Sequence, residues 1–128
     1  MRKLASIVAA AALSLIAVPA IAHHGWGGNV EQVSEMTGMV VESVKLAGPH
    51  ATMRIETDGK TWDLTLAPPA RTAASGLKPN LIPVGAMVTV IGNKNRNAQR
   101  FEMKTVEVRW NDKRYTVYPE RQAYLPQR

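Results

Sequence analysis

The fold of this chain is decided by the stretch at residues 51–66, ATMRIETDGKTWDLTL. Apolar and polar residues alternate over residues 51–56 and again over residues 61–66, which is the pattern of two half-buried strands. Between them lies Asp58-Gly59, a dipeptide that favours the tight turn of a hairpin. The stretch therefore predicts an antiparallel hairpin whose apolar face, including Trp62, points into a core.

The segments around this hairpin predict the rest of a small barrel. Gly38 lies within the first strand pattern, and such a glycine predicts a bulge or bend that lets one strand serve two sides of a barrel. The other expected elements are a strand at 36–46, a short helix at 69–76, strands at 87–92 and 101–110, and a candidate edge strand at 114–118. Together they predict an all-β fold, a five-stranded OB-like Greek-key barrel with one short helix between strands 3 and 4. A β-sandwich is the alternative, although about eighty residues of core offer too few strands for a typical one.

Residues 1–22 have the three parts of a secretory signal peptide. Met1-Arg2-Lys3 is cationic, residues 4–18 are apolar, and Pro19-Ala20-Ile21-Ala22 ends in the small-x-small pattern that signal peptidase accepts. The apolar part is shorter than the roughly 18 residues of a spanning helix. We therefore expect Sec export to the periplasm with cleavage after Ala22 and no membrane span in the product, an uncleaved anchor being the alternative. The expected organisation is a signal peptide at 1–22, a flexible N-terminal arm at 23–32, an OB-like barrel at 33–110 and a C-terminal tail at 111–128.

The composition limits the partners and the chemistry of the mature protein. The formal net charge is +6 and the chain has no cysteine. The basic residues near 94–100 and in the tail are spread out as on a solvated face, so we expect no nucleic-acid partner. Without cysteine the fold must rest on its apolar core, and any metal site must use imidazole, thioether, carboxylate or backbone ligands.

A set of short motifs runs from the expected cleavage site to the fourth strand. They are Ala22-His23-His24, Met36-Thr37-Gly38-Met39-Val40, Gly48-Pro49-His50, Leu77-Lys78-Pro79, Val84-Gly85, Val88-Thr89-Val90 and Gly92. This pattern resembles DUF6152, a family of exported bacterial proteins, over nearly the whole mature chain. The resemblance implies an exported protein with an OB-like fold and implies no activity. The usual Asn-Pro-His of the family is Gly48-Pro49-His50 here, and Thr52-Met53 replaces the aromatic residue that often follows.

A weaker resemblance, in fold and residue types alone, is to the small periplasmic copper chaperones of the CusF type. Their Trp-x-x-Met-x-Met run is absent from this chain. The resemblance implies no ligand set for this protein.

Histidines predict a metal site at the mature N-terminus. Cleavage after Ala22 would leave His23 with a free α-amino group, and that nitrogen and the imidazole Nδ1 can chelate one metal ion. His24 adds a second imidazole and His50 a third. Nitrogen ligands of this kind favour Cu(II), with Ni(II) and Zn(II) behind it. The alternative is a polar, disordered terminus and a histidine that braces a turn.

The methionines and aromatic residues suggest further contacts. Met39 is the candidate for an exposed thioether near the arm, because Met36 and Met53 share faces with core residues. Trp26, Trp110 and Tyr118 are candidate ligand-binding residues that could stack a sugar or a partner's side chains. The chain has no nucleophile elbow, phosphate loop or cysteine nucleophile, so we expect no enzyme. The expected function is binding of copper or another divalent metal by a monomer, and the alternative is a module that binds an envelope protein or a small ligand.

Overall fold

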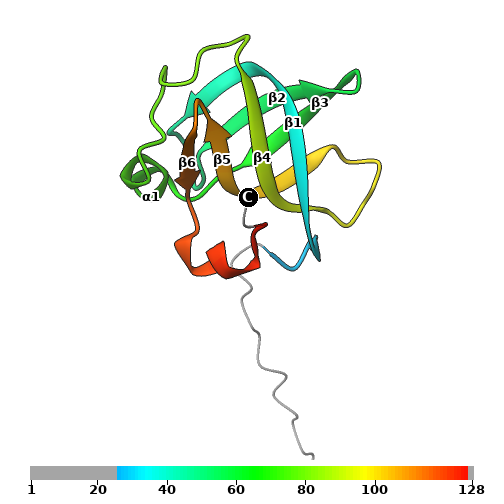
Figure 1. Ribbon diagram of the computed structural model, residues 1–128. Helices are drawn as coiled ribbons and strands as arrows, with labels where there is room; N and C mark the ends of the chain where they lie inside the picture. The colour runs from blue at the N-terminus through cyan, green and yellow to red at the C-terminus, as the bar shows by residue number, and fades with distance from the viewer. Residues whose placement is uncertain (1–25, 127–128) are drawn as a thin grey trace, which may run out of the picture.

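The computed structural model describes residues 26–126 (Figure 1). Within this range the chain forms six strands, one α-helix and one 3-10 helix. The elements are β1 (Asn29–Lys45), β2 (Thr52–Thr57), β3 (Lys60–Thr65), α1 (Pro69–Ala74), β4 (Met87–Asn95), β5 (Glu102–Trp110), β6 (Lys113–Thr116) and the 3-10 helix η1 (Pro119–Tyr124). The predicted 51–66 hairpin is present as β2 and β3. Its turn residues Asp58 and Gly59 both have positive φ, 52° and 73°, as the tight hairpin turn requires.

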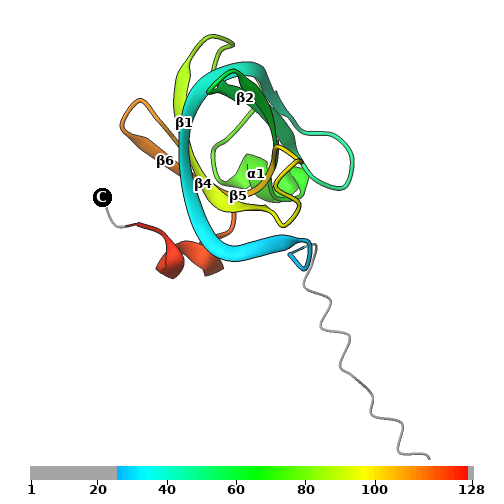
Figure 2. The same ribbon diagram turned by 90° about the vertical axis from the view of Figure 1, so that its right-hand side faces the viewer.

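The strands close into a barrel. Their order is β3-β2-β1-β4-β5-β6, and a parallel pairing of β3 with β5 completes a ring of β1 to β5. Figure 2 shows this ring nearly end-on, with β1 curving around one side. The connectivity, with one short helix between β3 and β4, confirms the predicted OB-like Greek-key barrel.

Strand β1 serves two sides of the barrel because it is long and bent. Its first part pairs with β4 as far as Met39↔Met87, and its second part pairs with β2 from Met39↔Glu56 onward. Gly38 lies at this change of partner, where a Cβ atom would come within 2.7 Å of the Glu56 carbonyl oxygen. Glycine at position 38 therefore permits the close approach of two backbones. The irregularities in the β1–β2 pairing lie after it, between Val40 and Glu42 and between Glu42 and Lys45.

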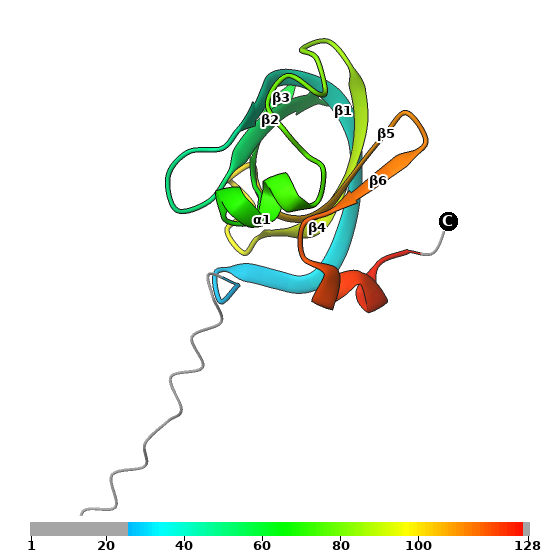
Figure 3. The ribbon, with the colours of Figure 1, turned by 90° about the vertical axis from the view of Figure 1, so that its left-hand side faces the viewer.

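The interior of the barrel is filled by aliphatic and thioether side chains. Met53 on β2 and Leu64 on β3 are opposite one another, and Met103 on β5 pairs with Leu64 from the other side. Trp62, predicted to face the core, is half-buried and packs against the core from its margin. Its ring also lies edge-to-face against Phe101, with centroids 5.4 Å apart. Helix α1 covers an open end of the barrel (Figure 3), and its buried Thr72 hydroxyl donates to the Ala67 carbonyl at 2.8 Å.

Strand β1 begins earlier than the sequence pattern predicts. Residues 29–32 belong to the strand, so the prediction of a flexible arm over 23–32 is wrong for these four residues. Residues 23–25 lie outside the described part of the chain. Hydrogen bonds to β4 hold the early strand. Asn29 Nδ2 donates to the Asn93 carbonyl at 2.8 Å, and Asn93 Nδ2 donates to the carbonyls of Val30 and Glu31. The Asn93 side chain on β4 thus holds the first residues of β1 in the sheet. The local sequence of residues 29–32 has no pattern that indicates this contact.

The C-terminal residues pack on the outside of the barrel. The candidate edge strand is β6, which pairs with β5 and is shorter than the expected 114–118. Beyond it, Tyr118 and Leu125 flank η1 and are buried in the core cluster. The outward-facing Ile91 of β4 and Glu107 of β5 are buried as well. The predicted tail is therefore a structural cover over one outer face of the barrel.

Gly92 on β4 provides a test of barrel closure. A Cβ atom there would overlap the carbonyl oxygen of Lys104 on β5, so Gly92→Ala should lower the free energy of unfolding by about 3 kcal/mol or prevent folding. The control is Gly27→Ala, since nothing lies within 4 Å of a Cβ atom at Gly27. Urea denaturation measures both variants. Equal stabilities would show that β4 and β5 are not in close contact at Gly92.

Candidate functional site

Trp26 and Tyr118 form the centre of a group of aromatic and cationic side chains at the start of β1. Their ring centroids are 5.1 Å apart in an edge-to-face arrangement. Lys104 Nζ lies 4.8 Å from the Trp26 centroid, and Arg121 Cζ lies 3.7 Å from it. Arg71 Cζ lies 5.2 Å from the Tyr118 centroid. We call these five residues the aromatic–cationic cluster. Cation–π attraction links them across segments distant in sequence.

The backbone around Trp26 is anchored to the loop after β4. Asn29 N donates to the Trp26 carbonyl at 3.0 Å and closes a turn. Arg96 donates twice to the same turn, from its backbone N to the Gly28 carbonyl at 2.9 Å and from Nε to the Gly27 carbonyl at 3.2 Å. These bonds fix where Trp26 meets the barrel.

Burial alters the titration of two groups in the cluster. Lys104 is 5% exposed, and burial, followed by the nearby charge of Arg121, lowers the pKa of its ammonium group. Burial raises the pKa of the Tyr118 hydroxyl, which donates a hydrogen bond to the Leu66 carbonyl at 3.3 Å. Lys104 is therefore held in a desolvated setting, where its charge acts more strongly on neighbouring groups than it would in water.

A cleft of about 700 Å³ lies between the start of β1 and η1. It is lined by Trp26, Gly27, Asn29, Val30, Glu31, Val33, Asn93, Arg96, Glu120, Arg121 and Tyr124. Glu120 is paired with Arg71, whereas Arg96, Arg121 and Glu31 have no ion pair among residues 26–126. Asn93 is 3% exposed, and its Oδ1 accepts no hydrogen bond within the described chain. The cleft thus combines guanidinium groups, aromatic rings and an unsatisfied acceptor.

Only two of the four predicted metal ligands, His50 and Met39, lie in the described part of the chain, and they lie near opposite ends of β2. His23 and His24 fall outside residues 26–126. His50 is half-buried in the loop before β2, and burial, with the charge of Lys104 second, lowers the pKa of its imidazole. Met39 is opposite Glu56 near the far end of β2. Within the described part of the chain no three His, Asp or Glu side chains are grouped to hold a metal ion.

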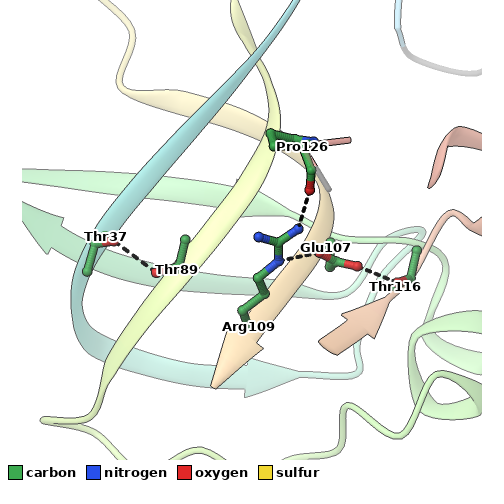
Figure 4. Close-up of polar contacts among 6 residues, drawn as sticks. All are labelled: Thr37, Thr89, Glu107, Arg109, Thr116 and Pro126. Carbon is green, nitrogen blue, oxygen red and sulfur yellow. Dashed lines mark hydrogen bonds and ion pairs between the residues drawn. The ribbon is translucent and has the colours of Figure 1, made fainter. Parts of the chain in front are cut away.

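Trp110 does not join Tyr118. It is the last residue of β5, six positions beyond Lys104, and lines a second cleft of about 500 Å³ with Thr89, Arg109 and Arg114. Figure 4 shows the polar contacts beside this second cleft. Arg109 donates from Nε to Glu107 Oε2 at 2.6 Å and from Nη2 to the Pro126 carbonyl at 3.0 Å. The Thr116 hydroxyl donates to the other carboxylate oxygen of Glu107, Oε1, at 2.7 Å. Farther along the sheet, the Thr37 and Thr89 hydroxyl oxygens lie 2.9 Å apart.

Sequence reasoning identified Trp26 and Tyr118 and missed Lys104, Arg96, Arg121 and Glu107. Charged residues that alternate with valines in a strand read as solvent-facing. Lys104 and Glu107 are instead covered by segments from both ends of the described chain. Glu107 is 1% exposed and paired with Arg109. The one sequence feature that could have indicated the burial of Lys104 and Glu107 is that their strand is followed by a tail with aromatic residues.

The comparisons with known proteins show the family of this chain. The model of DUF6152, described as a family of unknown function, matches residues 10–104. No curated protein matches the chain. Solved structures that match include the ZRD-deleted mutant of TiaS in complex with agmatine, at 15% identity and a TM-score of 0.47, covering 62% of this chain and 21% of that one. Apo TiaS, a tRNAIle2 agmatidine synthetase, matches at 16% identity and a TM-score of 0.46, covering 62% and 18%. This chain spans about a fifth of those structures, and similarity at this level carries no functional argument.

Within residues 26–126, no helix has the length and apolar character needed to cross a bilayer.

The pKa of His50 tests the site's electrostatics. A histidine NMR titration should place it below 6.5, and Lys104→Met should raise it while leaving it below 6.5, because burial is the larger cause. A lowered folded-state pKa means that this group's contribution to stability is complete above pH 6.5 and is lost as pH falls from 6.5 to the folded-state pKa. Arg100→Met, at an exposed position, is the control. An unchanged His50 midpoint in Lys104→Met would separate His50 from the cluster.

Proposed function

This chain belongs to DUF6152, a family of unknown function, and from its own residues we propose that it is an exported, non-catalytic binding protein of the periplasm. Its ligand is an organic anion with an apolar or aromatic body, held in the cleft between Trp26 and η1. The observation that carries the proposal is that two guanidinium groups and two aromatic rings line one cleft of about 700 Å³. Clefts of this size suit small ligands and short peptide ends.

The charges of the cleft favour an anion. Arg96 and Arg121 have no carboxylate partner among the described residues, and Glu120 is already paired with Arg71. Within residues 26–126, Glu31 is the one unpaired carboxylate of the lining, so two unpaired cations stand against one unpaired anion. Lys104 adds positive charge beneath Trp26. Guanidinium groups bind carboxylate, sulfonate and phosphate oxygens through charge-assisted hydrogen bonds. The Nε bond from Arg96 to the Gly27 carbonyl orients that side chain and leaves its other N–H groups for a ligand.

The remaining lining supplies apolar contact. Val30 and Val33 come from β1, and Trp26 and the largely exposed Tyr124 offer aromatic surface. An aromatic or aliphatic body against these side chains would be removed from water while its anionic group meets the arginines. Among residues 26–126 the lining contains no histidine, serine or threonine, so the described part of the cleft does not pair an imidazole with an aliphatic hydroxyl. This composition supports binding over catalysis.

Anilinonaphthalenesulfonate, an aromatic anion, is a suitable probe of this cleft. Its fluorescence should rise on binding, and the double variant Arg96→Gln/Arg121→Gln should weaken its affinity about tenfold, since both cations are lost. The matched control is Lys113→Gln/Arg114→Gln, which removes the same charge beside the second cleft. Equal losses in the two double variants, or none in the first, would refute the proposal.

A second function, copper binding at the mature N-terminus, is supported by one observation. The described chain begins at Trp26, whose ring contacts Lys104, and the charge of that same lysine lowers the pKa of His50. Lys104 therefore acts on both the Trp26 ring and the His50 imidazole. A lowered pKa favours the neutral form of the His50 imidazole, which ligation requires, whereas the Lys104 charge opposes a cation. In this proposal the His23 amine and the imidazoles of His23, His24 and His50 hold Cu(II).

Calorimetric titration tests the copper proposal. Protein that begins at His23 should bind Cu(II), and one extra glycine before His23 should weaken binding by about a factor of ten or more, because it removes the chelate ring. His50→Ala should weaken binding in the same direction. If all three proteins bind Cu(II) alike, neither the terminal amine nor His50 is a ligand.

A further inference from the structure

Three potential donor side chains lie in one row across neighbouring strands at the point where β1 changes partner. Met39 of β1 is directly opposite Met87 of β4 on one side and Glu56 of β2 on the other. Directly opposite residues on antiparallel strands have Cβ atoms about 4.5–5.5 Å apart. The row Glu56–Met39–Met87 thus brings two thioethers and a carboxylate within reach of one another on the outer face of the barrel.

The row faces solvent and not the core. The neighbours Gly38, Val40 and Val88 are buried, so alternation directs Met39 and Met87 outward. Met39 is 39% exposed and Met87 is 59% exposed, whereas Met36, Met53 and Met103 are buried. Two facing methionines thus leave part of their apolar surface and their thioethers open to water.

The chemistry of the row suits a soft monovalent cation. Thioether sulfur is a neutral, polarisable ligand that selects Cu(I) and its analogue Ag(I) over hard cations such as Mg²⁺. Methionine has three rotatable side-chain bonds, so the two sulfur atoms can converge on one ion without moving the backbone. Glu56 adds negative charge beside the sulfurs, and it has no ion pair among the described residues.

We propose that Met39 and Met87 together bind Cu(I) through their sulfur atoms, with the Glu56 carboxylate as the anionic member of the site. Binding is ligation alone, with no change in the oxidation state of the metal. The site is independent of the cleft at Trp26. It also uses neither the N-terminal amine nor His50, which lies at the opposite end of β2. The row supplies sulfur ligands, so it would take the reduced ion, whereas the proposed histidine site takes Cu(II).

Silver(I) titration of protein carrying ¹³C-labelled methionine methyl groups tests this proposal, since Ag(I) has the same ligand preference and no accessible redox change. The methyl signals of Met39 and Met87 should shift together and saturate with one ion, and those of the buried Met36, Met53 and Met103 should stay in place. The buried signals also report that the fold is intact. Silver bound by histidines elsewhere would leave all of these methyl signals unmoved.

Single substitutions distinguish one ion held by both sulfur atoms from two ions bound independently, one at each methionine. Met39→Leu should weaken the Ag(I) response of Met87 about tenfold, and Met87→Leu should do the same to Met39, because each loses its chelating partner. Glu56→Gln should weaken both about threefold, as removal of an exposed charge partner does. The proposal is overturned if each methionine responds with unchanged affinity in the other's leucine variant, or if neither methyl signal shifts at all.

Discussion

The barrel depends on one backbone contact, the passage of β1 across β2 at Gly38. At the next residue, Met39, β1 pairs with both β2 and β4, so one strand belongs to two ladders. A side chain at Gly38 would push the strands apart, because the Glu56 carbonyl oxygen occupies that space. Without this contact β1 could not bend into both ladders, and the parallel pairing of β3 with β5 would have no ring to close. The curvature also turns the early part of β1 toward η1, where the 700 Å³ cleft lies.

The second constraint is the cover that the C-terminal residues form over the outer face of β4 and β5. It buries Glu107 beside Arg109 and Lys104 beside Trp26. A buried charge is costly unless partners and hydrogen bonds compensate it. Glu107 has both, from Arg109 and Thr116, and Lys104 faces two aromatic rings. The cover therefore links both ends of the described chain to the same face of the barrel and forms one wall of the cleft.

The local patterns predicted the strands well and the site in part. The 51–66 hairpin and the helix before the fourth strand follow from alternation and turn residues, which act over a few positions. Trp26 and Tyr118 were candidate ligand-binding residues because aromatic side chains on an OB-like barrel could stack a sugar or a partner's side chains. The ring contact between Trp26 and Tyr118 depends on where β5 ends and η1 begins. So does the separation of Trp110 from Tyr118. No short-range pattern carries that information.

The sequence by itself determined the all-β class, the hairpin, the order of elements and the residue types available for ligands, because these depend on periodicity, turn chemistry and composition. Tertiary structure alone decided that Lys104 and Glu107 are buried, that β1 starts at Asn29, and that Met39 faces Met87 and Glu56. The physical reason is that burial and cross-strand pairing are set by segments many residues away. A charged or thioether side chain on a strand has the same local pattern whether water, another strand or a folded tail lies against it.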